Sequence, residues 1–366
     1  MPASRAGAVE APRVHRWLGV RLGDRLGSRD NNFDLLRLLA AWAVLVSHSY
    51  ALVGCEQPLH QFGTSLGNLG VLVFFAVSGL LIRRSWDHDP RARDFWAKRA
   101  LRLLPALAVT AMLTAFVLGP AVTSARLGTY FTSWETWLYP VRLVLMVPFG
   151  AKLPGVFDDN VYAGAVNGSL WSLPLEVLAY AMVAGLGALG LLARRWVVTS
   201  LALASLVWAA WWEPAMSDAV GSAYVVSAFA VGAAAFTWRD RIVLSTPVAM
   251  VIVAVCAATA LGPESLRVVT WTVSALYLSY WFAYCLPRVG RVLTRFGDTS
   301  YGLYIWAFPV QQVVVQVAGN DSDPWLVTGV ATPLVWLLAL ASWRLVERPA
   351  LRHKPRPTPG GPQDRA

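Results

Sequence analysis

Long apolar segments alternate with short polar segments along most of the chain, from Leu35 to Leu345. Most apolar segments are about 15–20 residues long, close to the length that an α-helix needs to cross the hydrocarbon core of a bilayer. This pattern predicts an all-α integral membrane protein with about ten transmembrane helices. We expect the spans at residues 33–53, 69–83, 103–119, 170–193, 196–212, 222–238, 247–262, 268–286, 301–318 and 325–346.

One further apolar segment, Trp137 to Phe149, does not fit the spanning pattern. It is short, and it contains Pro140, Arg142 and Pro148. Proline removes a backbone donor, and a spanning helix has to satisfy its own backbone groups in lipid. We therefore interpret this segment as interfacial or re-entrant.

The distribution of basic residues orients the predicted spans. Short cytoplasmic loops carry the excess of Lys and Arg. The tail before residue 30 holds six arginines, and the loop after the second span holds six more and Lys98. With ten spans, the later basic loops fall on this same side, whereas a span at 137–149 would place Arg194, Arg195 and every later basic loop outside. We expect both termini to be cytoplasmic.

Three regions follow from this topology. Residues 1–30 are expected to form a disordered basic cytoplasmic tail, residues 31–350 a transmembrane domain, and residues 351–366 a second disordered cytoplasmic tail. We interpret the net charge of +10 as topology and contact with anionic lipids, because no basic-aromatic nucleic-acid module accompanies it. The expected location is the inner (plasma) membrane, with the lipid bilayer and not nucleic acid as a partner. The sequence predicts no oligomeric state.

Two titratable side chains, Arg37 and His48, interrupt the first predicted span. Eleven residues at about 100° each turn the helix by about 1100°, roughly 20° past three full turns. Both side chains therefore share one helix face, and they lie about 16 Å apart along the helix axis. Ionisable groups inside a membrane are costly and indicate function. His48 is the only histidine inside a predicted span, and an imidazole can exchange a proton near neutral pH. His48 is therefore our candidate general base.

Two polar motifs near the second and third spans have two readings each. Ser78 and Gly79 remove side-chain bulk, which suits either a ligand or a packed helix. Arg99 and Arg102, three residues apart before Pro105, suit either a polyphosphate or lipid headgroups.

Further polar residues lie in the fourth and ninth predicted spans. Ser172, Glu176 and Tyr180 are spaced by four and share one helix face. Glu176 is either protonated, paired with Arg37, or part of a functional site. Tyr301 and Tyr304 share a face that also suits an aromatic interface belt. Glu347, just before Pro349, is interpreted as the mark of a helix end.

In this order, these segments resemble the membrane-bound acyltransferase-3 family, the O-acetyltransferases of bacterial surface polysaccharides and macrolides. The resemblance covers about residues 31–350. The matching motifs are Phe33-Asp34-Leu-Leu-Arg37 with His48, Phe74-Phe75-x-x-Ser78-Gly79, Arg99-x-x-Arg102-x-x-Pro105, Ser169-Leu-Trp171-Ser172-Leu-Pro-Leu-Glu176 and Ser300-Tyr301-Gly-Leu-Tyr304.

The resemblance implies an O-acyltransferase with ten spans. It implies acyl-CoA, by default acetyl-CoA, as a cytoplasmic co-substrate, with no permanently bound cofactor and no metal site. The implied acceptor is a hydroxyl of a carbohydrate, glycolipid or macrolide on the outer side. Many relatives carry a histidine where this chain has Ala307. Proton transfer then falls to His48 alone or with Glu176.

The resulting assignment has three groups of residues. His48, Arg37 and Glu176 are the catalytic candidates, with His48 as general base or transient acyl carrier. Acceptor specificity is expected in the outer loop 120–168. The competing function is a proton-coupled transporter or flippase that uses Arg37, His48 and Glu176 as a relay. The acyl-CoA candidates are Arg99, Arg102, Ser78, Gly79 and Phe75, and the supporting residues are Asp34, Trp171, Ser172, Tyr301 and Tyr304.

Overall fold

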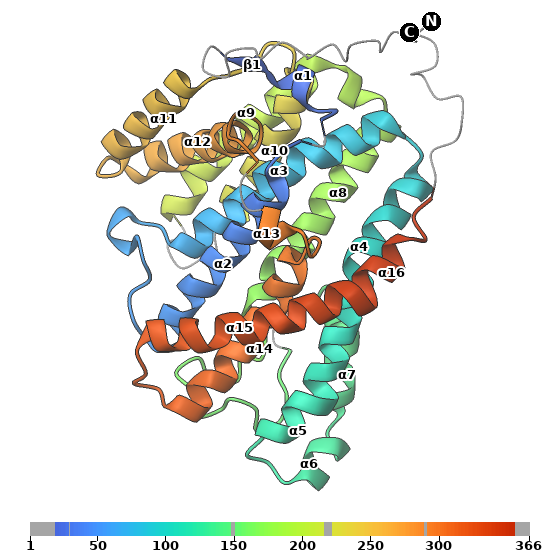
Figure 1. Cartoon of the computed structure of the whole chain (residues 1–366), viewed down its shortest axis with the longest axis vertical. Helices are drawn as coiled ribbons and strands as arrows, with labels where there is room; N and C mark the ends of the chain where they lie inside the picture. The colour runs from blue at the N-terminus through green and yellow to red at the C-terminus, as the bar shows by residue number, and fades with distance from the viewer. Residues whose placement is uncertain (1–18, 29, 148–150, 216–221, 289–290, 356–366) are drawn as a thin grey trace, which may run out of the picture.

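The computed structural model describes residues 19–28, 30–147, 151–215, 222–288 and 291–355. Helices dominate these residues, and the strands β1 and β2 have two residues each (Figure 1). The elements are β1 Val20–Arg21, α1 Leu22–Arg25, α2 Phe33–Leu52, η1 His60–Phe62, α3 Leu66–His88, α4 Ala92–Leu113, η2 Thr114–Leu118, α5 Gly119–Val122, α6 Leu127–Thr132, α7 Trp134–Val144, η3 Gly168–Trp171, α8 Ser172–Ala188, η4 Leu191–Ala193, α9 Arg195–Ala215, α10 Ser222–Thr237, β2 Val243–Leu244, α11 Thr246–Thr259, α12 Glu264–Cys285, α13 Arg291–Thr294, α14 Ser300–Ala318, α15 Pro324–Ser342, η5 Trp343–Glu347 and α16 Arg348–Leu351.

Every predicted span coincides with one of these helices or with a run of consecutive ones. Within the described residues, five helical segments are long and apolar enough to cross a membrane. They are Phe33–Leu52, Leu66–His88, Ala92–Val122, Gly168–Ala188 and Pro324–Leu351, and shorter apolar helices lie at Arg195–Trp211, Ser222–Thr237 and Thr246–Thr259. The all-α membrane class is confirmed to this extent. The number of crossings and the side of each terminus remain predictions.

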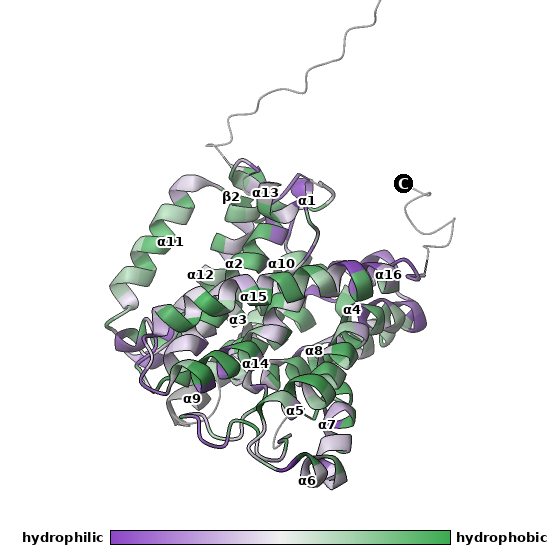
Figure 2. Ribbon diagram, turned by 60° about the horizontal axis from the view of Figure 1, so that its bottom comes forward, coloured by the Kyte–Doolittle hydropathy of each residue, from purple (hydrophilic) through white to green (hydrophobic). Residues whose placement is uncertain are grey.

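Apolar side chains cover the outside of the helix bundle. On α11, Met250 and Val251 are 65% and 62% exposed, and on α9, Trp211 is 73% exposed. Figure 2 shows hydrophobic residues along these helices and hydrophilic residues mainly in loops and at helix ends. A soluble protein rarely exposes so much contiguous apolar surface, whereas lipid tails cover it readily.

The helix α7 overlaps the segment from Trp137 to Phe149 that we expect not to span. Its eleven residues extend about 16 Å, about half of the hydrocarbon thickness. It packs along the α4–η2–α5 helix, with the rings of Phe116 and Trp137 5.1 Å apart. The length agrees with a segment that does not cross the bilayer. Residues 148–150 lie outside the described residues.

The prediction of a disordered N-terminal tail is wrong for residues 20–26. β1 pairs antiparallel with β2, and the side chains of Leu22 and Leu26 are buried. The buried side chains of Leu22 and Leu26 and the pairing of β1 with β2 hold this segment in a defined structure. The pairing places this segment beside the basic loop at Arg239 and Arg241, which was predicted on the same side of the membrane. Residues 1–18 and 356–366 lie outside the described residues.

Small residues allow the central helices to approach closely. A Cβ on Gly79 would lie 2.1 Å from the Phe229 carbonyl oxygen of α10, and one on Gly232 would lie 2.4 Å from the Ala76 carbonyl oxygen of α3. α14 packs against both α2 and α15, and its residues from Ser300 to Gln312 are all buried. The core therefore forms around α2, α3, α10 and α14, and α2, α3 and α14 carry most of the predicted site.

Candidate active site

Arg37 and His48 lie on one unbroken helix, α2, and face the same neighbour. Arg37 reaches Asp298, two residues before α14 begins, with 2.5 Å between Nη1 and Oδ2. The His48 ring packs edge-on against Phe308 of α14, with 5.3 Å between ring centroids. The two side chains therefore share a face of α2, as the eleven-residue spacing predicted.

His48 lines a cavity of about 1010 Å³. Its Nδ1 atom is buried and has no hydrogen-bond partner among the described residues. Ser47, Tyr304 and Phe308 line the same cavity near His48, and the 54–65 segment and the start of α12 line its outer part. An imidazole beside a cavity of this size can meet the hydroxyl of a bound molecule.

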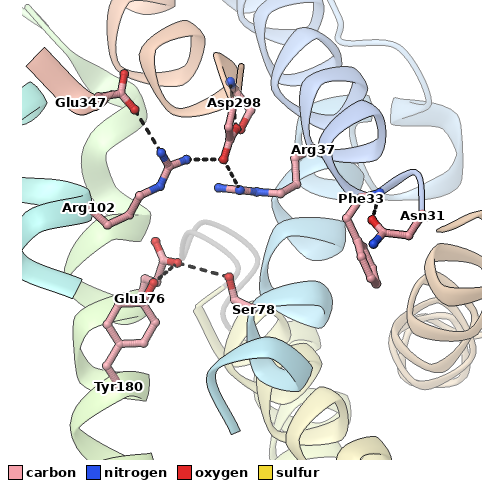
Figure 3. Close-up of polar contacts among 10 residues, drawn as sticks. Asn31, Phe33, Arg37, Ser78, Arg102, Glu176, Tyr180, Asp298 and Glu347 are labelled. Atoms are coloured by element: carbon pink, nitrogen blue, oxygen red, sulfur yellow. Dashed lines mark hydrogen bonds and ion pairs between the residues drawn. The ribbon is translucent and has the colours of Figure 1, made fainter. Parts of the chain in front are cut away.

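At the other end of α2, Asp298 joins two arginines. Its Oδ2 atom accepts hydrogen bonds from Arg37 at 2.5 Å and from Arg102 at 2.6 Å (Figure 3). Its Oδ1 atom accepts one from Ser300 Oγ at 2.6 Å. Burial tends to raise the pKa of Asp298, but Arg102, Arg37 and Ser300 outweigh burial and hold it well below the ordinary value. Asp298 therefore stays ionised and orients both guanidinium groups.

Glu347 is a buried partner of Arg102 and not simply the mark of a helix end, so that interpretation is wrong. Its side chain is 1% exposed, and its Oε2 atom lies 3.1 Å from Arg102 Nη1. The other carboxylate oxygen accepts a hydrogen bond from Ser342 at 3.0 Å. Glu347 ends a π-helical turn, η5, and a π-helical turn shifts the faces of the residues that follow it. The chain also stays helical beyond Glu347, through Leu351, so Pro349 does not end the helix.

Glu176 bonds to hydroxyl groups. Its Oε1 atom accepts hydrogen bonds from Ser78 at 3.2 Å and from Tyr180 at 2.5 Å. The ion pair of Arg37 within the described residues is with Asp298, so a direct Glu176–Arg37 pair is not formed. Figure 3 shows Glu176 below the Arg102–Asp298–Arg37 row. With Arg99 and Glu347, the described residues at this end of the site bring several cationic and carboxylate side chains together, and their charges offset one another in a poorly solvated region.

Arg99 differs from Arg102 in its partners. Its guanidinium lies over the ring of Phe95 at 4.3 Å and near the ring of Tyr180 at 6.0 Å. No carboxylate lies within ion-pair distance of it among the described residues. Arg102 instead contacts both Asp298 and Glu347. Of the two arginines predicted to bind phosphate, Arg99 is therefore the one whose guanidinium N–H groups are not used by a carboxylate and can bind an anion.

The turn before α4 fixes the direction from which Arg99 enters the site. Asp89 accepts a hydrogen bond from Arg91 Nε at 2.7 Å and another from Lys98 at 2.7 Å. These bonds hold the pKa of Asp89 well below its ordinary value, Arg91 having the largest effect. These two hydrogen bonds tie the α3–α4 connection to α4 at Lys98, one residue before Arg99.

Pro309 leaves a carbonyl of α14 free to bond to the segment before α8. Pro309 has no backbone N–H, so it cannot bond to the carbonyl of Ile305 four residues earlier. Asn167 Nδ2 donates to that carbonyl at 2.9 Å. Ser169 lies next to this contact, and its carbonyl accepts a hydrogen bond from the Tyr304 hydroxyl, which accepts one from Ser172 at 2.8 Å. The Asn167–Ser172 motif and the Tyr304–Pro309 motif are therefore two halves of one local structure.

Replacing Asn167 with alanine should destabilise the protein by about 1–2 kcal/mol, because the Ile305 carbonyl loses its partner in a part-buried site. Thermal unfolding in detergent measures this effect. The matched control is Asn320→Ala, since Asn320 also donates to a backbone carbonyl, that of Asp159, but in an exposed loop. Equal losses of stability in the two variants would contradict this account.

Comparison with known proteins identifies the family of this chain. A family model described as "Acyltransferase domain" (the acyltransferase-3 model) matches residues 30–344. This chain belongs to the acyltransferase-3 family. It is 33% identical over 340 residues to an "O-acetyl transferase" of Shigella phage Sf6, covering 87% of this chain and 96% of the relative. It is 28% identical over 359 residues to "Nodulation protein 10" of Rhizobium leguminosarum bv. viciae, covering 88% and 93%. No solved structure matches the chain.

The chain is therefore a membrane enzyme, an O-acyltransferase, rather than the transporter or flippase that its intramembrane charges also allowed. The family match covers both ends of the site, from Arg37 to Tyr304. Asp298 also lies within the matched residues, whereas Glu347 lies just beyond them.

Five further predicted residues of the acyltransferase occupy different places. Trp171 lines the His48 cavity. Tyr301 donates a hydrogen bond to the Leu103 carbonyl at 3.0 Å, which joins α14 to α4. Gly79 faces α10 and Phe75 is buried in the core, so both pack helices in this structure. Asp34 is exposed at the start of α2 and has no ion pair among the described residues.

The outer loop 120–168 contributes less to the acyltransferase cavity than we expected. Only Tyr162 and Gly168 from this loop line it within the described residues. Gln312 of α14 holds the loop in place by donating to the carbonyls of Tyr162 at 3.0 Å and Ala165 at 2.8 Å. Most of the outer wall comes from residues 54–65 and from Glu264, Arg267, Val268 and Trp271.

Asp298 and Glu347 were missed by sequence reasoning. Asp298 comes two residues before the Ser300–Tyr304 motif, and an acid beside a motif that enters a membrane was an available signal. Glu347 stands in a motif that was noticed but read as a helix end. Both residues pair with arginines that the sequence did identify, Asp298 with Arg37 and Arg102, and Glu347 with Arg102.

Proposed function

We propose that this enzyme transfers an acyl group, acetyl in the first instance, from acyl-CoA to a hydroxyl of a carbohydrate or other glycosylated acceptor. The observation that carries the proposal is His48, which lines a large cavity with an unpartnered Nδ1 atom, on the same helix that presents Arg37 to Asp298. The name of the phage relative, "O-acetyl transferase", supports acetyl as the acyl group.

The chemistry requires a base and a leaving-group acid. The acceptor hydroxyl oxygen attacks the thioester carbonyl carbon while its proton passes to the His48 imidazole. The tetrahedral intermediate then collapses, the carbon–sulfur bond breaks, and the proton moves from His48 to the CoA sulfur. The products are an O-acyl ester and free CoA. We favour this direct transfer, with an acyl group carried on the His48 ring as the alternative.

The donor end of the path is assigned to the charge cluster. Arg99 has no acidic partner among the described residues and suits the CoA phosphates, while Arg37 is positioned by Asp298 to contact the pantetheine arm or a phosphate. Phe74 lies between the two ends, 6.0 Å from the Arg37 guanidinium and 6.3 Å from the ring of Tyr304. Because Tyr304 lines the His48 cavity, this aromatic pair lies on the way from the donor end to the acceptor cavity.

The orientation in the membrane follows from the same proposal. The basic loops gather at the Arg37 end, next to β1 and β2, so this end faces the cytoplasm where CoA thioesters are made. The His48 cavity then opens toward the outer side of the plasma membrane. The acceptor arrives there as part of a glycan, a glycolipid or a glycosylated small molecule.

Replacing Arg99 with alanine should raise the KM for acetyl-CoA about tenfold and leave kcat nearly unchanged, because one charge-assisted contact to a phosphate is lost. Steady-state kinetics with purified enzyme measures both constants. Arg93→Ala is the control, since Arg93 lies on the same helix but is exposed. An unchanged KM in the Arg99 variant, or an equal rise in the control, would contradict the assignment.

The proposed function as a whole is tested in cells and with purified protein. Cells that express the enzyme, compared with cells that lack it, should contain glycans or glycosylated metabolites heavier by one acyl group, detected by mass spectrometry. Purified enzyme in lipid vesicles should move label from carbonyl-labelled acetyl-CoA to the same molecules and release free CoA. Absence of both signals would reject the proposal.

A further inference from the structure

The start of α12 presents two polar side chains to the His48 cavity. Arg267 and Trp271 are four residues apart on α12, so they lie on one helix face, and both line the cavity. The Trp271 Nε1 atom is buried and has no hydrogen-bond partner among the described residues. Buried indole N–H groups normally have a partner, because an unpaired one loses its hydration without compensation. Trp271 therefore has an N–H donor that no described residue uses, on a side chain that lines the cavity.

Trp281, on the same helix, differs from Trp271 because its indole N–H has a hydrogen-bond partner. It is also half-buried, but its Nε1 atom donates to Thr246 Oγ1 at 3.3 Å. The indole of Trp271 thus differs from that of Trp281 in its unsatisfied N–H and in its place beside the cavity. A purely structural tryptophan at position 271 would not need either property.

Arg267 is held at the outer part of the cavity by neighbouring groups, and no carboxylate of the described residues neutralises its charge. Its Nη1 atom donates to the Gly262 carbonyl at 3.2 Å, and a Cβ on Gly63 would lie 2.3 Å from its Nη2 atom. No carboxylate lies within ion-pair distance of its guanidinium in the part of the chain that the structure describes. The remaining donors of this guanidinium are available to oxygen atoms in the cavity.

The size and lining of the cavity indicate the kind of molecule. A volume of about 1010 Å³ lies at the upper end of the range for drug-sized ligands, so it exceeds the need of one sugar ring. The outer wall combines aromatic rings with carboxylates and amides, namely Tyr162, Trp171, Trp271, Glu56, Gln57 and Asn68. Aromatic faces pack on the apolar face of a sugar ring, and these polar groups bond to its hydroxyls.

We propose that Trp271 and Arg267 form a second sugar subsite, which binds the unit next to the one that is acylated at His48. This inference rests on the proposed function and narrows it, since the acceptor is then an oligosaccharide or glycoside of at least two units. The Trp271 indole donates to a ring substituent of the second unit, and Arg267 donates to its hydroxyl or carboxylate oxygens. Acceptor selection thus falls to the start of α12 more than to the loop 120–168.

Binding to a printed array of defined mono-, di- and oligosaccharides tests the subsite without acyl-CoA. Wild-type enzyme in detergent should bind glycans of two or more units better than their single-unit counterparts. Trp271→Phe keeps the ring but removes the N–H, and it should weaken this binding about three- to tenfold. Arg267→Gln should weaken it by a similar factor. Trp281→Phe is the matched control and should bind like the wild type.

Four outcomes would overturn the subsite. They are no binding of any glycan, equal binding of single units, equal loss in the Trp281 control, and wild-type binding in both Trp271→Phe and Arg267→Gln. A fall in acetyl-CoA binding in Trp271→Phe would indicate damage to the fold. In that case Trp271→His is tested instead. It keeps a ring N–H and should retain part of the glycan binding. Acyl transfer that depends on His48, with glycan binding independent of Trp271, would leave the proposed function intact and reject only the subsite.

Discussion

Replacing His48 with alanine should lower the rate of acyl transfer by about 10²–10⁴-fold, the usual contribution of a positioned general base. Folding should be largely preserved. The Nδ1 atom of His48 has no partner among the described residues, so the substitution breaks no hydrogen bond at that atom, and the edge-on packing against Phe308 is lost. The rate is measured by CoA release and ester formation, and folding by gel filtration and thermal unfolding in detergent.

His60 supplies the control for this experiment. It lines the same cavity, but it is exposed and lies 3.7 Å from Glu56 at the outer part. His60→Ala should therefore keep most of the activity. Substantial transfer by the His48 variant, or an equal loss in the His60 variant, would remove His48 from its role as base. Trapping of a labelled acyl group on wild-type protein would favour the acyl-carrier route instead.

Replacing Asp298 with asparagine should destabilise the protein by about 3–5 kcal/mol, the cost of removing one partner from a buried ion pair. Arg37 and Arg102 would lose their shared carboxylate, and the cluster would hold one positive charge too many. Acyl transfer should also fall about 10–100-fold, because Arg37 would no longer be held in place at the donor end. Thermal unfolding and steady-state kinetics measure the two effects separately.

Asp87→Asn is the matched control for the Asp298 variant. Asp87 also pairs with an arginine, Arg83, at 3.0 Å, but the Asp87 side chain is 49% exposed. Removal of its charge should change stability by less than about 1 kcal/mol. Similar losses in both variants, or a stable and active Asp298→Asn enzyme, would show that the shared carboxylate does not organise the site.

The helices of this enzyme could be predicted from the sequence because their signal is local. A run of apolar residues long enough to cross a bilayer specifies a helix in lipid whatever its neighbours are, since no other open structure satisfies the backbone there. All ten predicted spans are helices in the structure, and Arg37 and His48 lie on one face of α2 as their spacing required. The motifs of the family were likewise readable from adjacent residues.

The pairing of the site residues could not be predicted in this way. Asp298 lies 261 residues after Arg37 and 196 residues after Arg102, so no local pattern connects them. The sequence offered Glu176 as the partner of Arg37, whereas the packing of α14 against α2 brings Asp298 to Arg37 instead. Glu347 was misread because Pro349 was taken to end the helix, whereas the chain stays helical through Leu351 and Glu347 pairs with Arg102.

The sequence by itself determined that this chain is a helical membrane protein with a family motif set and two aligned ionisable residues in its first span. These features depend on hydrophobicity and spacing within single segments. Only the tertiary structure decided which acids neutralise the arginines, that Gly79 packs against α10, and that the 54–65 segment and the start of α12, more than the loop 120–168, line the His48 cavity. Contacts between distant helices depend on how side chains of particular shapes and charges fit together, and that fit has no signature within one segment.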